Sequence, residues 1–465
     1  MGIIKIAKAS GSSIQQQLYD QLRTAIIEGR TQAGERLPST RSLAAQLNIA
    51  RGTVDLAYAR LAEEGYIVAR GQRGTIVSPQ VQSLLRTRTT RATWVSKHQP
   101  GDDYSLRFRL GVPALDLFPR KAWSRVAARE ARKVGTASLP YPDPAGLPTL
   151  REAITTYLAV ARGIACSPNQ VVVTAGYQAA LNFVAHLVLT PGDSVWLEDP
   201  AYGFALEALR SLSMRIFPVP VDEEGIRVGY GRSNCPHAAL AVVTPAHQFP
   251  LGTTLSLPRR QALLAWASDS DSWILEDDYD CEFYYRGHRP PALKSIDSAD
   301  RVFYAGSFSK TLFPALRLGY LVVPTRFHDS AKRACRTLHR GAAVLEQSVV
   351  TAFMAEGHFA RHLRRMRVRY RARRQALADA LNKQFGNDVE VILQAGGLHI
   401  LARFPGHGSD VDLADQALRH GLMPHPLSRQ FIEHDPRQGL LMSFTNIPEQ
   451  ESLNIVAALH RAIVR

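Results

Sequence analysis

The residues around Lys310 are of types that can trap an aldehyde. The apolar run at 301–305 predicts a short buried strand, and the turn residues after it would lift Lys310 into a cavity. Burial lowers the pKa of an amine, and a lysine with a lowered pKa can form a Schiff base with a carbonyl compound. Ser307, Ser309 and Arg317 add the hydroxyls and the planar guanidinium that bind a phosphate group.

Acidic and phenolic side chains follow a second apolar run, at 273–275. A strand end there would present Asp277 and Tyr279 to the same cavity as Lys310. A carboxylate in that place can keep a pyridine nitrogen protonated. A lysine that forms a Schiff base, together with an acidic partner for a pyridinium ion, is what pyridoxal phosphate requires of a protein. The predicted cofactor is therefore pyridoxal 5'-phosphate.

A further phosphate contact is predicted at the turn between the apolar run 171–174 and the helical pattern that follows it. Gly176, Tyr177 and Gln178 occupy this turn, and backbone amides at the start of a helix can hold a phosphate. Many strand-to-helix turns contain glycine, so this signal has weight only beside the lysine site.

Composition sets wider bounds. A chain of 465 residues is long enough for two or three domains with ample core. The formal net charge of +15 suggests a polyanion partner such as nucleic acid, although charge alone is weak evidence. No apolar run approaches the ~18 to 20 residues of a membrane span, and no signal peptide pattern is present, which predicts a cytoplasmic protein. The 4 scattered cysteines include no Cys-x-x-Cys pair, so they are interpreted as structural thiols, and no metal site is predicted.

The first 78 residues carry the signals of a small helical unit with a hairpin. Helices are predicted at 14–29, 39–47 and 51–64, and a two-stranded hairpin at 66–77. Ser39 or Thr40 can cap the second helix, and the tight turn at 48–50 joins it to the third in a helix-turn-helix pattern. The hairpin tip carries two arginines and is interpreted as a wing.

Three regions are predicted: a DNA-binding unit at 1–78, a basic flexible linker at 79–104, and a large domain at 105–465. In the large domain short apolar runs alternate with helical patterns, which predicts an α/β fold with a mostly parallel sheet. The densest basic stretch, 361–374, predicts an exposed helix. It is interpreted as a solvated or dimer-facing helix, with a non-specific DNA track as the alternative.

The large domain resembles the fold-type I aminotransferases. Their motif Ser-x-Ser-Lys is followed by an arginine seven positions further on, as Lys310 is by Arg317, and the resemblance continues at 141–151, 198–202 and 245–252. It implies pairing of Asp277 with the pyridine nitrogen, contact of Tyr279 with the phenolic oxygen, stacking of Tyr202 on the ring, and a homodimer in which Tyr141 reaches the partner's phosphate. A core role is the alternative for Tyr202.

Residues 14–78 resemble the GntR-type winged helix in the motifs at 38–44, 51–54, 61–65 and 74–75. This resemblance implies contacts with phosphates and base edges of double-stranded operator DNA by Arg41, Arg51, Thr53, Arg73 and Gly74. A GntR-like head joined to an aminotransferase-like body resembles the MocR-type regulators.

The body departs from the enzymes at three positions. Phe249 stands where aminotransferases have an asparagine bound to the cofactor's phenolic oxygen, and His247 or Gln248 is predicted to replace it. Leu441 aligns with the arginine that binds a substrate carboxylate, and leucine cannot make that clamp. Phe204 aligns with a second arginine, found in the GABA-responsive regulator.

The predicted function is a pyridoxal phosphate-dependent transcriptional regulator. It would bind operator DNA through its winged helix and sense an amine, an amino acid or a B6 vitamer through its aminotransferase-like domain. The alternative is an active pyridoxal phosphate-dependent aminotransferase with an accessory DNA-binding domain, against which Leu441 weighs. A DNA-binding scaffold without cofactor is a third possibility that Lys310 disfavours. The sequence does not identify the effector.

Overall fold

A computed structural model of the chain describes residues 12–71, 74–81, 106–287, 289–338, 342–434 and 436–464. The chain divides into two compact units, residues 1–102 and 103–465. We call them the head and the body. Most of the predicted linker, 82–104, lies outside the described residues. Among the described helices, none combines the length and the apolar character needed to cross a membrane.

The head is a helix-turn-helix followed by a hairpin. Its elements are α1 (Ile14–Ile27), α2 (Thr40–Leu47), α3 (Arg51–Glu63), β1 (Ile67–Ala69) and β2 (Thr75–Val77). Ser39 caps α2 by accepting a hydrogen bond from the Ser42 amide, and Asn48 ends it in the left-handed conformation, with φ of 50°. Leu18, Val54 and other apolar side chains of all three helices form the buried core. The predicted elements of the head are therefore confirmed.

The body is built on an eight-stranded sheet with the order β3-β10-β9-β8-β7-β4-β5-β6. Its strands are β3 (Val171–Thr174), β4 (Ser194–Asp199), β5 (Arg215–Asp222), β6 (Gly225–Ile226), β7 (Leu240–Val243), β8 (Trp273–Asp278), β9 (Val302–Ser307) and β10 (Gly319–Val322). Five neighbours, β9, β8, β7, β4 and β5, run parallel, whereas β10 and β6 are antiparallel to the strands beside them. The predicted α/β fold with a mostly parallel sheet is confirmed.

Helices cover both faces of this sheet. Successive side chains of each strand point to opposite faces and pack against the helices of one layer or the other. Val172 packs into one layer with α7, α8 and α11, whereas Val171 and Val173 pack into the other with α6, α12 and α13. The covering helices are α5 (Arg120–Lys133), α6 (Pro148–Arg162), α7 (Tyr177–Val188), α8 (Gly203–Ser211), α9 (Val228–Asn234), α10 (Leu257–Asp269), α11 (His328–Leu338), α12 (Val344–Ala355) and α13 (His358–Phe385).

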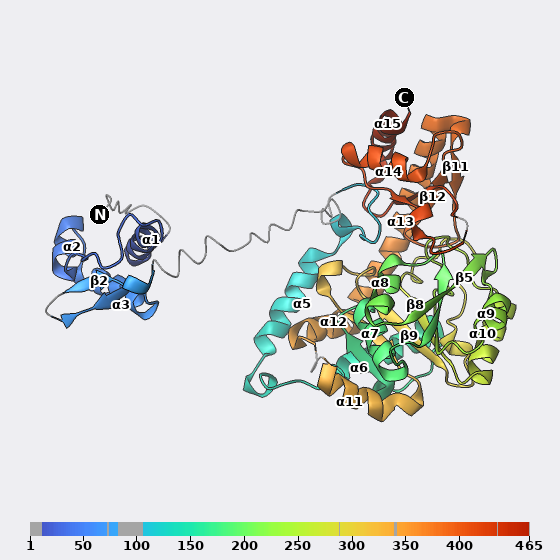
Figure 1. Ribbon diagram of the computed structural model, residues 1–465, viewed down its shortest axis with the longest axis horizontal. Helices are drawn as coiled ribbons and strands as arrows, with labels where there is room; N and C mark the ends of the chain where they lie inside the picture. The colour runs from blue at the N-terminus through green and yellow to red at the C-terminus, as the bar shows by residue number, and fades with distance from the viewer. Residues whose placement is uncertain are drawn as a thin grey trace. The chain divides into compact units, whose positions relative to one another are not determined.

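A second, antiparallel sheet closes the C-terminal part of the body. Its order is β11-β12-β14-β13, and its elements are β11 (Glu390–Ile392), β12 (His399–Arg403), β13 (His425–Pro426) and β14 (Leu440–Ser443), with α14 (Asp410–Arg419) and α15 (Ser452–Ile463) beside it. These elements gather at one end of the body, beyond the edge of the large sheet (Figure 1). The basic stretch 361–374 lies within the helix α13, but the prediction that this helix is exposed is wrong in part, because Arg373 and Arg374 are buried with the apolar face that packs on the core.

Candidate active site in the body

The lysine and the acidic group meet at the carboxyl ends of neighbouring parallel strands. In β8 and β9, Asp277 pairs in register with Ala305, and Asp278 pairs with Gly306. Strand β9 ends at Ser307, and Lys310 stands in the turn after it. In open α/β sheets this edge is where ligands bind. The structure therefore brings the predicted residues Asp277 and Lys310 to the same edge of the sheet.

Lys310 is a partly buried amine. Its Nζ donates a hydrogen bond to the carbonyl oxygen of Gly111, 2.9 Å away. Burial lowers the pKa of Lys310, and the nearby charges of Asp277 and Asp280 raise it in part. A lysine in these surroundings is neutral at a lower pH than an exposed lysine, and the neutral amine is the form that attacks a carbonyl.

Asp277 is a buried carboxyl in an acidic neighbourhood. Burial and the charges of Asp278 and Asp280 raise the pKa of Asp277, and the charge of Lys310 opposes this rise. The Tyr177 hydroxyl hydrogen-bonds to the Asp277 side chain. A protonated pyridine nitrogen would give Asp277 the cationic partner that stabilises its ionised form. The site thus fits the predicted cofactor at its ring nitrogen.

Aromatic rings form a wall of the same site. The centroid of the Tyr202 ring lies 6.2 Å from that of Tyr177 and 5.5 Å from that of Phe249. Phe249 in turn lies 6.4 Å from Tyr279. This continuous aromatic surface includes Tyr202, the residue predicted to stack on a pyridine ring.

His247 and Tyr279 are joined by a hydrogen bond. The Nδ1 atom of His247 lies 3.1 Å from the Tyr279 hydroxyl and 3.1 Å from a carboxylate oxygen of Asp280. Gln248, by contrast, donates to the carbonyl oxygens of Pro200 and Phe249 and is almost fully buried. Of the two residues predicted to replace the enzymes' asparagine, the geometry favours His247.

The predicted phosphate end is assembled by strand register. Gly319 of β10 pairs with Thr174 on one side and with Ser307 on the other, so the turns after β3 and β9 lie together. Gly176 is the N-cap of α7, with φ of 102°, and no atom lies within 4 Å of the place a Cβ atom would take there. The Ser307 hydroxyl accepts a hydrogen bond from the Ser309 amide. The two serines and the helix start therefore share one corner of the sheet.

Two predicted phosphate ligands have exposed side chains. Arg317 precedes the strand β10 in the left-handed conformation, with φ of 50°. No hydrogen bond or ion pair holds its guanidinium within the described part of the chain. Gln178 is exposed in the first turn of α7. Tyr141 is 85% exposed, so a role on a second subunit stays a prediction.

The position aligned with the carboxylate-binding arginine lies in a cluster of leucines, with His425 of β13 paired to it in the sheet. Leu441 of β14 is fully buried with Leu401 and Leu427, and Leu110 and Leu251 pack against these three leucines. Phe204, at the second arginine position, is 54% exposed beside Tyr202. Neither position offers a carboxylate a cation.

Two contacts of the site were not predicted from the sequence. Gly111, whose carbonyl accepts the Lys310 hydrogen bond, lies 199 positions earlier in the chain. Asp280 is almost fully buried beside His247 and Tyr279. The sequence around Gly111 has a glycine followed by Val112 and Pro113, a turn signal that carries no information about a partner so distant.

The predicted DNA-binding residues lie in the second and third helices of the head and in its hairpin. Arg41 is exposed in α2, and Arg51 is the exposed first residue of α3, where its Nε lies 3.5 Å from Asp55. Thr53 is half-buried. Gly74 has φ of 82°, and the Arg36 side chain packs against it. Arg73 lies outside the described residues.

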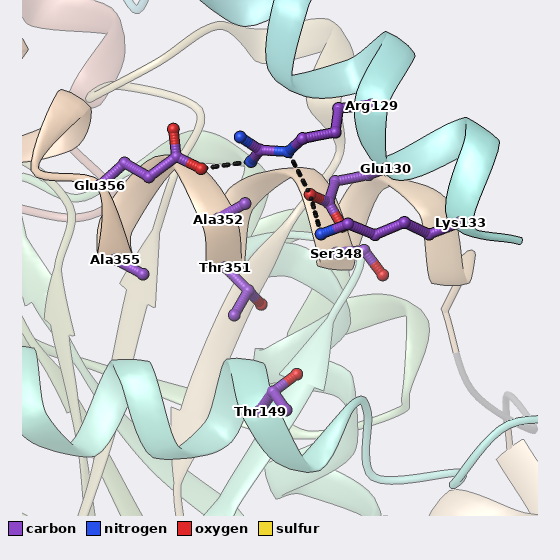
Figure 2. A pocket seen from close by; sticks show the side chains of 9 residues that line it. All are labelled: Arg129, Glu130, Lys133, Thr149, Ser348, Thr351, Ala352, Ala355 and Glu356. Atoms are coloured by element: carbon purple, nitrogen blue, oxygen red, sulfur yellow. Dashed lines mark hydrogen bonds and ion pairs between the residues drawn. The ribbon is translucent and has the colours of Figure 1, made fainter.

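A separate groove opens between α5, α6 and α12 (Figure 2). It has a volume of about 550 Å³, and none of the predicted site residues lines it. Glu130 accepts hydrogen bonds from Arg129 and Lys133, and Arg129 also pairs with Glu356. Because these charges neutralise one another, the groove is a poorer phosphate site than the one near Lys310.

Comparisons with known proteins bear on both units. Residues 14–77 match the family of bacterial regulatory proteins, gntR family, and residues 109–426 match aminotransferase class I and II. The chain is 34% identical to a probable rhizopine catabolism regulatory protein, MocR, of Rhizobium meliloti, over 97% of this chain and 94% of that protein. It is 33% identical to the pyridoxine biosynthesis transcriptional regulator PdxR of Corynebacterium glutamicum, over 83% of each.

Among solved structures, the chain is similar to an archaeal alanine:glyoxylate aminotransferase. The TM-score is 0.71 and the identity is 25%, over 77% of this chain and 90% of that chain. This similarity agrees with the fold of the body. The predicted winged helix and fold-type I aminotransferase domain are thus confirmed as the fold class.

Proposed function

Because this chain belongs to the MocR-type regulators of the GntR family, we propose that its body is a pyridoxal phosphate-dependent sensor that controls operator binding by its head. The protein is a transcriptional regulator with an aminotransferase-like domain. The winged helix contacts double-stranded DNA, and we place the protein in the cytoplasm, where that DNA is found.

One observation carries the cofactor assignment. A lysine with a lowered pKa stands within the electrostatic reach of a buried aspartate at the carboxyl edge of a parallel sheet. Most surface lysines have neither burial nor such a partner. Lys310 supplies the amine for a Schiff base, and Asp277 supplies the acid for a pyridinium ion.

The other residues of the site orient the same group. His247 and Tyr279 hold the phenolic oxygen, Tyr202 covers a ring face, and Tyr177 orients Asp277 through its hydrogen bond. Ser307, Ser309, Arg317 and the amides at Gly176, Tyr177 and Gln178 hold the phosphate. When bound, the cofactor supplies an aldehyde that bonds to amines and a ring that accepts electrons.

The apolar surroundings of Leu441 support a sensor over an efficient transaminase. Productive transamination of an ordinary amino acid needs its carboxylate held in one orientation, and Leu441 and Phe204 provide no cation for it. We therefore propose an effector that is an amine, an unusual amino acid or a B6 vitamer. The similarity to a pyridoxine biosynthesis regulator supports the last of these.

A homodimer completes the proposal. Tyr141 and the nearby Leu139 are 85% and 72% exposed, as apolar residues that contact a second copy would be in one chain alone. A two-fold body would also present two heads to two half-sites of an operator.

The test measures DNA binding and turnover in the same protein. A duplex selected from a random pool by the full-length protein serves as the operator. Its affinity is measured without cofactor, with pyridoxal phosphate, and then with a panel of amines and amino acids, each of which is also assayed for transamination. We expect ligands that react at Lys310 to change operator affinity. Rapid multiple turnover, with operator affinity indifferent to each of those ligands, would establish the enzyme instead.

A further inference from the structure

Residues 106–116, which we call the strap, are the first described residues of the body after the undescribed stretch 82–105. Gly111 lies near the middle of the strap, and its carbonyl oxygen accepts the hydrogen bond from Lys310 Nζ at 2.9 Å. A Cβ atom at Gly111 would lie only 2.8 Å from that nitrogen, and Gly111 has φ of 79°. The contact therefore depends on a close approach that only glycine permits.

The rest of the strap is bound to the C-terminal part of the body. The carbonyl oxygens of Arg107 and Phe108 accept hydrogen bonds from the amides of Met423 and Ser443, at 2.8 and 2.9 Å. Arg107 also forms a 2.7 Å ion pair with Glu451. Further contacts join Leu106 to Asn446, Val112 to Thr445, Ala114 to Tyr370 and Asp116 to Arg373.

One anchored residue is held in an unfavourable backbone conformation. Phe108 is fully buried with φ of 66°, which costs free energy in any residue other than glycine. Rearrangement of the strap would release this free energy, so the described conformation depends on the contacts that hold it. The contact made by Gly111 is the one that chemistry at the site would remove.

The bonding state of Lys310 changes what this nitrogen can donate. A free ammonium has three N–H donors. When the Lys310 amine condenses with an aldehyde, its nitrogen forms a C=N bond, the carbonyl oxygen leaves as water, and at most one N–H remains. An amine ligand that takes the place of Lys310 on the same carbon transfers two protons to the lysine nitrogen, which becomes a free donor again.

We propose that Gly111 is the docking point of the unbonded Lys310, and that the strap passes the bonding state of Lys310 to the segment 82–105 and so toward the head. This inference rests on the proposed function and adds the path by which a reaction at Lys310 would affect the head. With Lys310 free, its hydrogen bond holds the strap in the described conformation. With Lys310 bonded, we take the hydrogen bond to Gly111 to be lost, because the nitrogen keeps at most one N–H and is held by its new C=N bond. The strap then loosens.

Hydrogen exchange at single amides of the full-length protein tests the contact. The amides of Met423 and Ser443 report on the strap because they donate to it, and the Val173 amide, which donates to Ala145, is the internal reference. In protein stripped of cofactor, Lys310→Met keeps the length of the side chain but removes its donors. We expect exchange at both reporting amides to rise by about twofold to tenfold, the range set by the net free energy of one hydrogen bond.

Adding pyridoxal phosphate to the wild type should produce the same acceleration, and adding it to Lys310→Met should produce none. Gly111→Ala should accelerate exchange more in the wild type than in Lys310→Met, because the contact is already lost in Lys310→Met and only the strain of alanine at φ of 79° remains to be added. Gly192→Ala is the matched control, since Gly192 has φ of 96° and open space at its Cβ position and lies in the turn before β4, not beside a reporting amide. It should leave the reporting amides unchanged.

The possible outcomes distinguish a failure of the strap proposal from a failure of the cofactor assignment. A visible cofactor band in the wild type with equal exchange in all states overturns the strap and leaves the cofactor assignment standing. No band, with faster exchange in Lys310→Met, supports the contact and rejects the cofactor.

The proposed route from the strap to the segment 82–105 is tested by the rate of tryptic cleavage within that segment. We expect pyridoxal phosphate to change the cleavage rate at least twofold in the wild type and not in Arg107→Gln. A rate indifferent to cofactor in the wild type overturns the route.

Discussion

The head and the body present their functional side chains in opposite environments. In the head, Arg41 and Arg51 are exposed, and the Arg51 side chain has 67% of its surface accessible. In the body, Asp277 and His247 are buried, at 7% and 4% exposure. Exposed cations act on a polyanion one by one, and salt screens them. Buried polar groups depend on their neighbours for their charge and orientation, so changing one changes several.

This difference predicts two kinds of response to mutation. A replacement in the head should weaken one contact and leave the fold and the other contacts in place. A replacement in the body should alter the chemistry of the whole site, because Lys310 and Asp277 each shift the pKa of the other. The predictions below test this contrast, beginning with the largest effect.

Lys310→Ala should abolish covalent binding of pyridoxal phosphate, because Lys310 is the amine that stands in the turn at the carboxyl end of β9. The measurement is the visible absorption spectrum of the purified protein before and after borohydride reduction. Lys332→Ala, which replaces an exposed lysine in α11, is the control and should keep the band. A reducible band of wild-type strength in Lys310→Ala would show that the lysine was wrongly assigned.

Asp277→Asn should weaken cofactor binding by about 1.5 to 3 kcal/mol, the usual contribution of a hydrogen bond to a charged group. The amide cannot stabilise a pyridinium ion as a carboxylate does, although it occupies nearly the same volume. Equilibrium titration followed by absorbance gives the dissociation constant. Asp329→Asn, an exposed acid in the first turn of α11, is the matched control. Equal cofactor affinities of the wild type, Asp277→Asn and Asp329→Asn would show that Asp277 does not contact the cofactor.

Arg51→Ala should reduce operator affinity by about 1 to 3 kcal/mol and relax the sequence preference, as loss of one bidentate base contact does. Its pair with Asp55 is exposed, so the fold should lose little stability. Arg60→Ala is a control in the same helix, because Arg60 pairs with Glu64 and lies over the Tyr19 ring of the head's own core. An Arg51→Ala protein with unchanged affinity and preference would contradict base reading by this residue.

The same contrast explains which features could be predicted from the sequence. The head was predictable because its signals are local: apolar spacing in three helices, a cap at Ser39 and a turn at Asn48. In the body, strands and the Lys310 turn were predictable, since buried parallel strands are continuous apolar runs that end in polar residues.

The remaining features depend on tertiary geometry. The contact between Gly111 and Lys310 joins residues 199 positions apart, and no local pattern encodes it. The left-handed conformation of Arg317, in the turn before β10, is likewise set by the fold and not by a local pattern. The choice between His247 and Gln248 also required the fold, because only the packing of β4 against β7 gives Gln248 its buried acceptor at Pro200.

The smallest predicted effect is a shift in the pH dependence of cofactor capture by Lys310. It tests directly whether the side chains of the body, unlike those of the head, depend on one another. Capture of the cofactor aldehyde requires the neutral form of Lys310, so its rate should rise with pH through the pKa of that amine. Burial lowers this pKa below that of an exposed lysine, about 10.4, so the midpoint should fall below that value. Stopped-flow absorbance between about pH 6 and pH 11 measures it. The charge of Asp277 raises the pKa of Lys310, so Asp277→Asn should move the midpoint to still lower pH. A midpoint at or above that of an exposed lysine, unaltered by Asp277→Asn, would mean that the two groups are not coupled and that the body behaves, like the head, as a set of independent side chains.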